Sequence, residues 1–522
     1  MNLLLDPIFR VKTLSGIQKM SLPQLLDALG QDSVESLVGI QRHQEDGFHV
    51  FLCYLASTIL ARRGNTNASQ TADYWLDGLR DLAGEHGDDA WTLVVEDLSR
   101  PAFMQPPIPL SDQPQLRLKA ETPDEMDLLV TAKDHDVKLR RAHQPHLDHW
   151  VYALVNLQTM SGFLGRGQMG IARMNGGFGN RLIVEVVRSF RPGARWRDAI
   201  ERLLAYRKTL LDSEYGYRHD GLSLVWLAPW NGKTSLSLSQ LDPFFLEVCR
   251  RVRLRKHSNN TLTVDGLPTT VTRLDAKLLL GAVGDAWLPV DLSKDRKALT
   301  VSARGLTPDL LRRIIFSDHL ILSPLQRPEG TWRNTCWLTA SVLVRGQGKT
   351  EGFYERRIPI PPAAQARVFG RSEERDALAD LAKRGIDFAG KMRNPVLKLA
   401  VFSYLQGGVE HPRLDRDAIE GWWTRISQDF EARWTPDYFP WLWSAADRDT
   451  PAFRQDALVE WAQVLRDHAL ASLSEAEHSL PVKSGRHYRA LVEGRRTFFR
   501  LLTHKNNFPF LKEDQHERIV AE

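Results

Sequence analysis

The segment Ile358–Pro362, which reads IPIPP, divides the sequence into two parts of different character. Its prolines lack a backbone N–H and have a fixed φ, so the segment favours extended chain and interrupts regular structure. Short strand-like runs alternate with helical patterns before it, whereas long helical patterns follow one another after it. We therefore predict an α+β protein, with a large mixed α/β domain over residues 1–365 and a helical domain over residues 366–522.

The first part contains both kinds of element. Leu222–Leu227 (LSLVWL) and Trp337–Val344 (WLTASVLV) are rich in β-branched or large apolar residues, which predicts strands. Asp46–Arg62 and His149–Met160 carry apolar residues around most of a helical projection, which predicts buried helices. The hydrophobic content of 43% over 522 residues is sufficient for a large core.

The second part predicts four helices. They cover residues 372–406, either continuous or broken near Pro395, and then 414–433, 451–478 and 484–504. Pro436 and Pro440 follow the second of these segments and predict that it has ended before them. Fairly short connections favour an antiparallel four-helix bundle.

Charge and cysteine content exclude several classes of protein. The net charge is +5 and the pI near 9.0, a mild excess that permits a phosphate-bearing partner if the charge is clustered. Cys53, Cys249 and Cys336 are isolated, which excludes a four-cysteine zinc site and argues against disulfides. There is no long apolar run, and the N-terminal one stops at Asp6, so we expect a cytoplasmic protein without a signal peptide.

Glycine is concentrated in one stretch, SGFLGRGQMGIARMNGGFGNR, which has seven glycines in 21 residues. It contains GRGQMG (Gly165–Gly170), the G-x-G-x-x-G spacing of a dinucleotide loop. That loop needs a strand before it and a helix within it, whereas the preceding segment reads as a helix. Two interpretations stay open: a flexible surface loop, or backbone that approaches a ligand closely while Arg166, Arg173 and Arg181 contact phosphate.

A second glycine pattern, GQGKT (Gly346–Thr350), follows a predicted strand and ends like a P-loop. The position of the first P-loop glycine falls on Leu343, which disfavours a nucleoside triphosphate site. The pattern instead predicts a hairpin tip with Gln347 pointing outward, or an ordinary hairpin turn.

Histidine and basic residues gather between the two predicted helices of the first part. His143, His146 and His149 recur at every third residue, but Pro145 interrupts them and neighbouring cations oppose metal binding, so we predict no metal. The same region favours a basic, mobile loop or a merely solvated one. Its charged residues are Lys133, His135, Lys138, Arg140 and Arg141.

The last predicted helix has two faces. Tyr488, Leu491, Phe498 and Leu502 are predicted to face the core. Four arginines share another face, which predicts either a nucleic-acid-facing stripe or plain solvation. They are Arg486, Arg489, Arg496 and Arg500. The sequence has no G-x-S-x-G, H-E-x-x-H or metal-spaced carboxylate set, so we expect neither an enzyme nor a cofactor.

Five segments, in this order, carry a resemblance to a known family: NLLLDPIFRV, RPAFMQ, LVTAKDHD, SGFLGRG and VCRRVRL. The sequence resembles, along essentially its whole length, the CasA family, the large subunit of the type I-E CRISPR surveillance complex Cascade. The resemblance implies an N-terminal α/β domain followed by a four-helix bundle and no enzymatic activity. It also implies that the protein recognises the short motif beside the target, the PAM, helps to open the duplex and helps to recruit a helicase–nuclease.

The resemblance also implies site residues. A glycine loop that enters the PAM minor groove matches Gly162, Phe163, Leu164, Gly165, Arg166 and Gly167. A glutamine wedge matches Gln347, flanked by Gly346, Gly348 and Lys349. A basic finger falls at Arg273 or Lys277, and the loop that docks on the guide RNA and its capping subunit matches Lys133–Arg141.

Implied partners are guide crRNA, the other Cascade subunits, double-stranded DNA with a PAM and the recruited helicase–nuclease. Some family members carry cysteine pairs that suggest zinc; this sequence lacks them, and no metal is expected. Two alternatives stay open: a nucleotide-dependent enzyme that uses GRGQMG or GQGKT, and a scaffold that binds RNA and subunits without recognising DNA.

Overall fold

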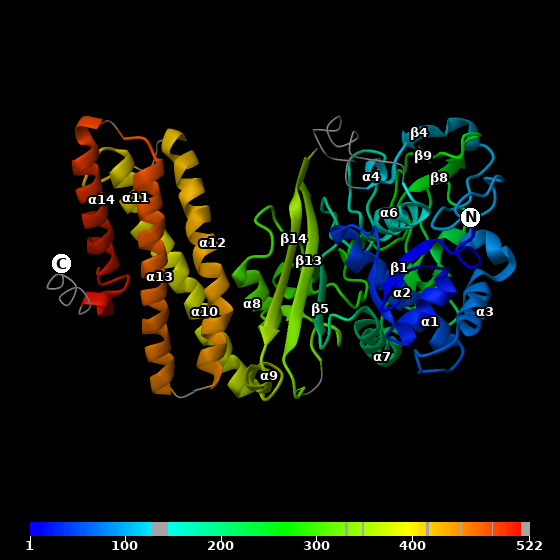
Figure 1. The fold of residues 1–522 in the computed structure, drawn as a ribbon, viewed down its shortest axis with the longest axis horizontal. Helices are drawn as coiled ribbons and strands as arrows, with labels where there is room; N and C mark the ends of the chain where they lie inside the picture. Colours follow the sequence, from blue (N-terminus) through cyan, green and yellow to red (C-terminus); the bar gives the residue numbers. More distant parts are fainter. Residues whose placement is uncertain are drawn as a thin grey trace. The chain divides into compact units, whose positions relative to one another are not determined.

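A computed structural model describes residues 1–127, 145–328, 332–346, 349–413, 417–447, 451–482 and 484–512 (Figure 1). The chain divides into two compact units. The first comprises Met1–Leu306, His319–Glu329 and Asn334–Pro359, and the second comprises Thr307–Asp318, Gly330–Arg333 and Ile360–Glu522. Within the described ranges, no helix is both long and apolar enough to cross a membrane.

Two helices form the centre of the first unit's core. They are α2 (Arg42–Arg62) and α6 (Leu147–Met160), which confirms both predicted helices. Their aromatic side chains interlock: the rings of Phe48 and Tyr152 lie 4.9 Å apart at 79°, an edge-on contact. The surrounding helices are α1 (Leu22–Gly30), α3 (Ala72–Ala83), α4 (Pro123–Met126) and α7 (Pro192–Leu211).

The described strands form small sheets rather than one continuous sheet. The orders are β2-β1-β3, β4-β9-β8, β14-β13-β5 and β11-β10-β12, with a parallel pair β6-β7. Their bounds are β1 (Phe9–Thr13), β2 (Gly16–Met20), β3 (Val34–Leu37), β4 (Arg117–Ala120), β5 (Ile183–Val187), β6 (Leu222–Leu224), β7 (Leu241–Leu246), β8 (Arg251–Lys256), β9 (Leu262–Leu267), β10 (Val290–Asp291), β11 (Lys297–Ala298), β12 (Leu320–Ile321), β13 (Cys336–Gly346) and β14 (Lys349–Ile360).

The two predicted strands differ in outcome. The one over Trp337–Val344 is confirmed as the middle of β13. The one over Leu222–Leu227 is correct only as far as Leu224, where β6 ends and a 3-10 turn begins. The turn carries Trp226 into the core, where its indole nitrogen donates to the carbonyl of Ala90 at 3.0 Å. Tertiary packing therefore overrides the local strand preference.

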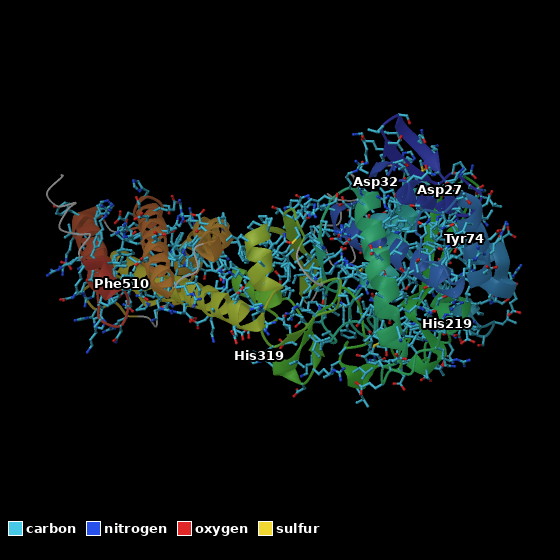
Figure 2. The ribbon with its side chains drawn as sticks, turned by 90° about the horizontal axis from the view of Figure 1, so that it is seen from below. Asp27, Asp32, Tyr74, His219, His319 and Phe510 are labelled. Atoms are coloured by element: carbon cyan, nitrogen blue, oxygen red, sulfur yellow. The ribbon has the colours of Figure 1, made fainter. Side chains whose placement is uncertain are left out.

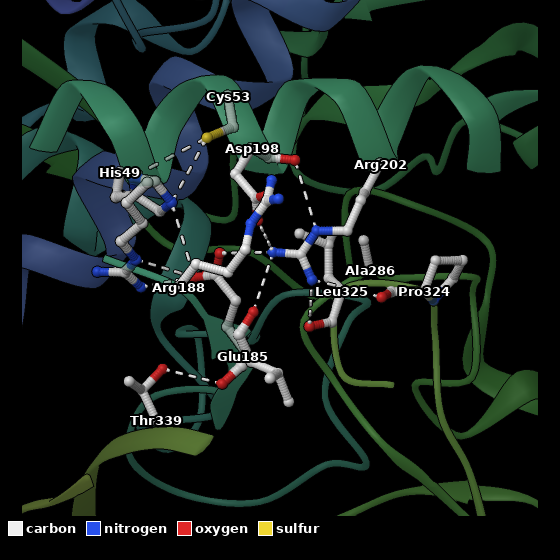
Figure 3. Close-up of polar contacts among 12 residues, drawn as sticks. His49, Cys53, Glu185, Arg188, Asp198, Arg202, Ala286, Pro324, Leu325 and Thr339 are labelled. Atoms are coloured by element: carbon white, nitrogen blue, oxygen red, sulfur yellow. Dashed lines mark hydrogen bonds and ion pairs between the residues drawn. The ribbon is translucent and has the colours of Figure 1, made fainter. Parts of the chain in front are cut away.

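Strand β5 contains a fully buried carboxylate, Glu185, between apolar residues. Two guanidinium groups of α7 reach it: Arg195 at 2.8 Å and Arg202 at 3.7 Å. Arg202 also donates to the carbonyl of Leu325 at 3.1 Å, as Figure 3 shows. These contacts attach α7 to the sheet β14-β13-β5 and compensate the charge of the buried carboxylate.

Helix α7 begins against the end of α1. Asp32, labelled in Figure 2, accepts a hydrogen bond from the backbone N–H of Ala194 at 3.0 Å and pairs with Arg191 at 3.0 Å. A carboxylate in this position satisfies an N-terminal donor of the helix and interacts favourably with its dipole.

The second unit is helical, as predicted, and its long helices lie side by side in Figure 1. Helix α10 (Ser372–Lys391) passes through a π-helical stretch (Met392–Leu397) into α11 (Lys398–Leu405), so this segment is broken at Pro395. The others are α12 (Asp417–Asp447), α13 (Pro451–Ser479) and α14 (His487–Leu502), with short helices α8 (Pro308–Phe316) and α9 (Pro362–Val368). The predicted fold class, mixed α/β followed by a four-helix bundle, is confirmed.

The prediction that the second long helix ends near residue 433 is wrong, because α12 continues through Pro436 and Pro440 to Asp447. Both prolines are exposed, and the residues whose carbonyls lose a helical donor, Ala432 and Pro436, are exposed as well, so water can reach this side of the helix. On the opposite face, Tyr438 donates to the carbonyl of Ala382 at 2.7 Å and Trp441 stacks on Trp461 at 4.8 Å. Packing of these aromatic residues holds the helix together despite its prolines.

We expect Pro436→Ala to stabilise the second unit by about 1–3 kcal/mol, because alanine restores a helical N–H donor and removes the steric penalty. Calorimetric unfolding of the full chain measures this change. Pro451→Ala is the control: Pro451 is the first residue of α13, where proline loses no helical hydrogen bond, and little change is expected. A lower melting temperature for Pro436→Ala would contradict the explanation.

Candidate nucleic-acid interface

The predicted glycine loop is a closed turn at the surface of the first unit. Leu164 N–H donates to the carbonyl of Gln168 at 3.1 Å, and Gln168 N–H donates back to that of Gly165 at 3.0 Å. Gly165 has φ +116° and Gly167 has φ +84°, values that side-chain-bearing residues rarely adopt. Arg166 lies between them and is exposed. The turn thus presents backbone and one cation to solvent.

The other glycines of the stretch bring two backbone segments together. Gly162 N–H donates to the carbonyl of Gly179 at 2.6 Å, and Phe163 N–H donates to that of Gly177 at 3.1 Å. A Cβ at Gly162 would lie 2.2 Å from the Gly177 carbonyl oxygen. Close backbone contact therefore explains why so many glycines occur here.

Two of the three arginines of this stretch, Arg173 and Arg181, are buried. Arg173 and Arg181 are 2% exposed and pair with the buried Asp285 at 3.7 Å and 2.7 Å. Arg173 also lies over the ring of Phe245 at 3.7 Å. Their predicted role as phosphate contacts is corrected, because a buried guanidinium is retained by its carboxylate partner.

Arg250 holds the glycine loop by hydrogen bonds from the buried side. Its side chain is buried and donates to the carbonyl of Gly162 at 2.9 Å and to that of Met169, so it joins the two ends of the loop. On the same side, Thr269 N–H donates to the Gly167 carbonyl at 2.9 Å. Arg250 is not among the site residues predicted from the sequence, although it lies in the VCRRVRL segment.

The GQGKT pattern belongs to a hairpin. Gly346 ends β13 and Lys349 begins β14, and the two strands are neighbours in one sheet. Gln347, Gly348 and the side chain of Lys349 lie outside the described residues. GRGQMG follows α6, and the next regular element described is β5. Neither pattern therefore has the strand–loop–helix geometry of a nucleotide-binding loop.

A buried chain of hydrogen bonds joins the glycine stretch to the end of β13 that leads into the hairpin turn. Asn156 of α6 donates to the Asp127 carboxylate at 2.6 Å and accepts from the Asn180 side chain at 3.2 Å. Asn180 N–H donates to the carbonyl of Leu343 in β13 at 2.8 Å. Arg345 of β13 donates to the Asp127 carbonyl at 2.9 Å, so the network connects β13 back to Asp127.

Asp127 is the most connected member of this network. It is 2% exposed, and its carboxylate also lies 2.7 Å from His43 Nε2 and accepts from Gln44 at 2.9 Å, both on α2. Burial raises the pKa of Asp127, but the nearby His43 and Arg345 and the hydrogen bonds outweigh it and hold the pKa below its usual value. Asp127 thus remains a carboxylate in the core.

The two candidates for the basic finger differ in exposure. Arg273 is 1% exposed, and burial lowers its pKa to about 10. It donates to the carbonyls of Ala228 at 2.9 Å and Pro229 at 3.3 Å. Arg273 is therefore a structural residue, which corrects its predicted role as a finger. Lys277 is exposed at the start of the 3-10 turn Lys277–Leu279, beside the glycine loop.

The predicted guide-RNA loop lies outside the described residues, including Lys133, His135, Lys138, Arg140 and Arg141. It begins shortly after Asp127 in the sequence. His149, just beyond it, lies 2.8 Å from a guanidinium nitrogen of Arg10. Across the described ranges there is no group of three His, Cys, Asp or Glu residues that could hold a metal ion.

The basic face of α14 lies in the second unit. All four of its arginines are exposed: Arg486, Arg489, Arg496 and Arg500. Arg496 lies 3.6 Å from Glu493, a weak pair in solvent. The prediction that Tyr488 faces the core is wrong, since it is 80% exposed. Small residues such as Gly494, which lies against Tyr404, form much of the packed face instead.

Solved structures of CasA and Cse1 proteins share this fold. CasA from Thermus thermophilus is 13% identical, with a TM-score of 0.61 over 96% of this chain and 99% of that chain. Cse1 from Thermobifida fusca is 14% identical, with a TM-score of 0.60 over 96% of each chain. A chain from a CRISPR RNA-guided surveillance complex is 13% identical, with a TM-score of 0.58 over 96% and 99%. The chain therefore has the CasA/Cse1 fold.

At the level of sequence, no protein-family model matches the chain, and no curated protein matches it.

We expect Asp127→Ala to destabilise the first unit by about 3 kcal/mol, because it leaves several buried donors without an acceptor. Denaturant unfolding of the full chain measures the loss. Because the folded pKa is lowered, the stabilisation by Asp127 is present above its unfolded pKa, about 3.9, and is lost as pH falls through the lower folded value. Asp220→Ala, at a 75% exposed side chain, is the matched control and should cost little; equal losses would contradict a special role for Asp127.

We expect Arg250→Met to loosen the glycine loop, since methionine fills part of the space but donates no hydrogen bond to Gly162 or Met169. Amide hydrogen exchange over residues 162–170 should accelerate about tenfold or more, equivalent to a lost charged hydrogen bond of about 1.5 kcal/mol. Arg255→Met is the comparison. It also removes an arginine from β8, but Arg255 pairs with Asp265 at 3.2 Å and not with the glycine loop, so exchange in the loop should not change. Unchanged exchange in the loop would refute the anchoring role of Arg250.

Proposed function

We propose that this chain is the large subunit of a type I-E CRISPR RNA-guided DNA surveillance complex and is not itself an enzyme. The observation that carries the proposal is the likeness to CasA and Cse1 structures over 96% of the chain, one of them from a CRISPR RNA-guided surveillance complex. The order of the five sequence segments supports the same conclusion independently. Its partners would be guide crRNA, the other subunits and double-stranded target DNA.

Within that complex, the glycine loop would contact the PAM through the minor groove. That groove is only about 6 Å wide, so a turn made of backbone enters it more easily than one covered with side chains. Arg166 at the tip and Lys277 beside the loop are exposed cations that can contact phosphate. Because the minor groove mainly distinguishes A·T from G·C, this mode of contact favours a tolerant PAM.

The hairpin tip around Gln347, with Gly346, Gly348 and Lys349, would help to open the duplex beside the PAM. Unstacking a base step costs a few kcal/mol, which contacts to the opened DNA must offset. The buried network that joins the C-terminal end of β13 to Asn180 supports the proposal, because it ties the strand that leads into the hairpin to the glycine stretch. The loop Lys133–Arg141 would contact the guide RNA, the α14 arginines would contact nucleic-acid backbone, and the opened complex would help to recruit a helicase–nuclease.

Gly165→Asp tests the proposal in the reconstituted complex. Its φ of +116° strains any residue with a side chain, and aspartate adds repulsion from phosphate, so PAM-dependent duplex binding should weaken about tenfold or more. A mobility-shift assay with and without the PAM measures it. Gly64→Asp is the matched control, since Gly64 also has positive φ with open space around it, and binding should be unchanged.

Two other outcomes would contradict the proposal and favour a different function. If the wild-type complex assembles but binds duplexes with and without a PAM equally, the chain is a scaffold for RNA and subunits. If NAD(P) or ATP-Mg binds the chain saturably and raises its melting temperature, a nucleotide-dependent enzyme is favoured.

A further inference from the structure

A cavity of about 240 Å³ lies inside the first unit, and none of its described lining residues belongs to the glycine stretch. Its walls come from α1, β3, α2, the start of α7 and the strands β13 and β14. Pockets for drug-sized ligands usually measure about 300–1,000 Å³. This cavity therefore suits a smaller molecule of one or two rings.

Much of the cavity wall is apolar and aromatic. Leu37 and Ile40 line it and are half-buried, and Phe190 lines it and is 39% exposed, so part of the apolar surface remains accessible. Phe48 and Trp196 also line it and are fully buried. Aromatic walls of this kind favour an aromatic occupant, because rings pack face to face or edge to face.

One face of α2 lines the cavity from its rim to its interior. Arg42, Glu45, His49 and Leu52 follow one another at intervals of three or four residues, which places them on one side of the helix. The exposed fraction of the side chain falls from 43% at Arg42 to 12% at His49, and Leu52 is 4% exposed. His49 therefore lies in the inner part of the cavity, where some of its ring is still accessible.

Each charged residue among the described lining is already paired. Arg195 lies 2.9 Å from Asp46, which also accepts a hydrogen bond from Ser341. The other pairs are Arg357 with Glu355, Arg42 with Glu45 and with Glu355, and Lys12 with Glu35. A charged ligand would have to displace one of these partners or enter with its own charge uncompensated, which costs free energy. The cavity therefore favours an uncharged occupant.

His49 is the polar residue of the lining whose hydrogen-bonding capacity is not used. Its Nε2 lies 3.6 Å from Cys53 Sγ and 3.8 Å from a carboxylate oxygen of Glu185 (Figure 3). A thiol is a weak partner, and 3.8 Å is too long for a hydrogen bond to oxygen. Burial and the nearby Arg195 lower the pKa of His49 well below its ordinary value, so the ring is neutral. A neutral imidazole offers one donor and one acceptor nitrogen.

We propose that this cavity binds a small, uncharged aromatic molecule that carries one hydrogen-bonding group. The ring would lie against the aromatic side chains of the wall, and the polar group would form a hydrogen bond with His49. This inference does not depend on the proposed function, because it involves neither nucleic acid nor the residues of the proposed interface.

The experiment measures binding of indole and of indene to the full-length wild-type chain by equilibrium dialysis. The two molecules share a shape, but only indole has an N–H. We expect indole to bind saturably with a Kd of about 1 mM or tighter.

His49→Phe keeps a ring at this position but has no nitrogen. It should lower the ratio of indole affinity to indene affinity about tenfold, the effect of losing one hydrogen bond. His219→Phe is the matched control, since His219 is exposed and does not line the cavity, and the ratio should not change.

Three molecules of nearly equal shape test the preference for an uncharged ligand. They are benzamide, which is neutral, benzamidine, which is a cation, and benzoate, which is an anion. Benzamide should bind the wild-type chain at least about tenfold more tightly than either ion, because no lining charge is free to pair with them.

Photo-crosslinking of the wild-type chain with 5-azidoindole locates the site without any variant. Labels that excess indole competes away should fall on peptides that contain residues 37–52 or 190–196. Labels only elsewhere, or no saturable binding of indole, would refute the site. An unchanged affinity ratio in His49→Phe, or a benzamidine or benzoate affinity above that of benzamide, would also overturn the inference. None of these results affects the proposed function, since no assay contains DNA or RNA.

Discussion

The buried carboxylate of Asp127 is the interaction on which the arrangement of the surface loops depends. It joins α2, through His43 and Gln44, to α6, through Asn156. Asn156 then leads to Asn180 at the end of the glycine stretch, whose backbone reaches β13. A satisfied polar network in a core specifies geometry more narrowly than apolar contacts do, because each hydrogen bond has a direction. The glycine stretch is thus attached to the core and to β13 by hydrogen bonds of defined direction.

Glycine has two distinct physical roles in this region. At Gly165 and Gly167 it permits positive φ, which shapes the exposed turn. At Gly162 and Gly170 it permits backbone to lie against backbone, which anchors the turn. A sequence shows the concentration of glycines but does not distinguish these roles, because the second depends on segments far apart in the chain.

Sequence reasoning predicted the regular elements better than it predicted side-chain environments. The buried helices α2 and α6 and the strand β13 follow from apolar patterns, and the break at Pro395 follows from proline chemistry. Helix α12 was predicted too short because a local rule about proline ignores aromatic packing from α13. The arginines were the hardest to place. Arg173 and Arg273 are buried beside partners distant in the sequence, and composition alone cannot separate them from the exposed Arg166.

Hydrogen bonds hold the glycine loop in its shape. They come from its own backbone, from the Arg250 guanidinium and from the backbone N–H of Thr269, and together they form the frame of the loop. The side chains at Leu164, Arg166 and Gln168 contribute no hydrogen bond to that frame among the described contacts, and Arg166 and Gln168 are exposed. Natural variation at these tip positions therefore meets little penalty in folding. Single substitutions at the tip therefore change the surface that the loop presents to solvent while the hydrogen bonds that hold the loop remain.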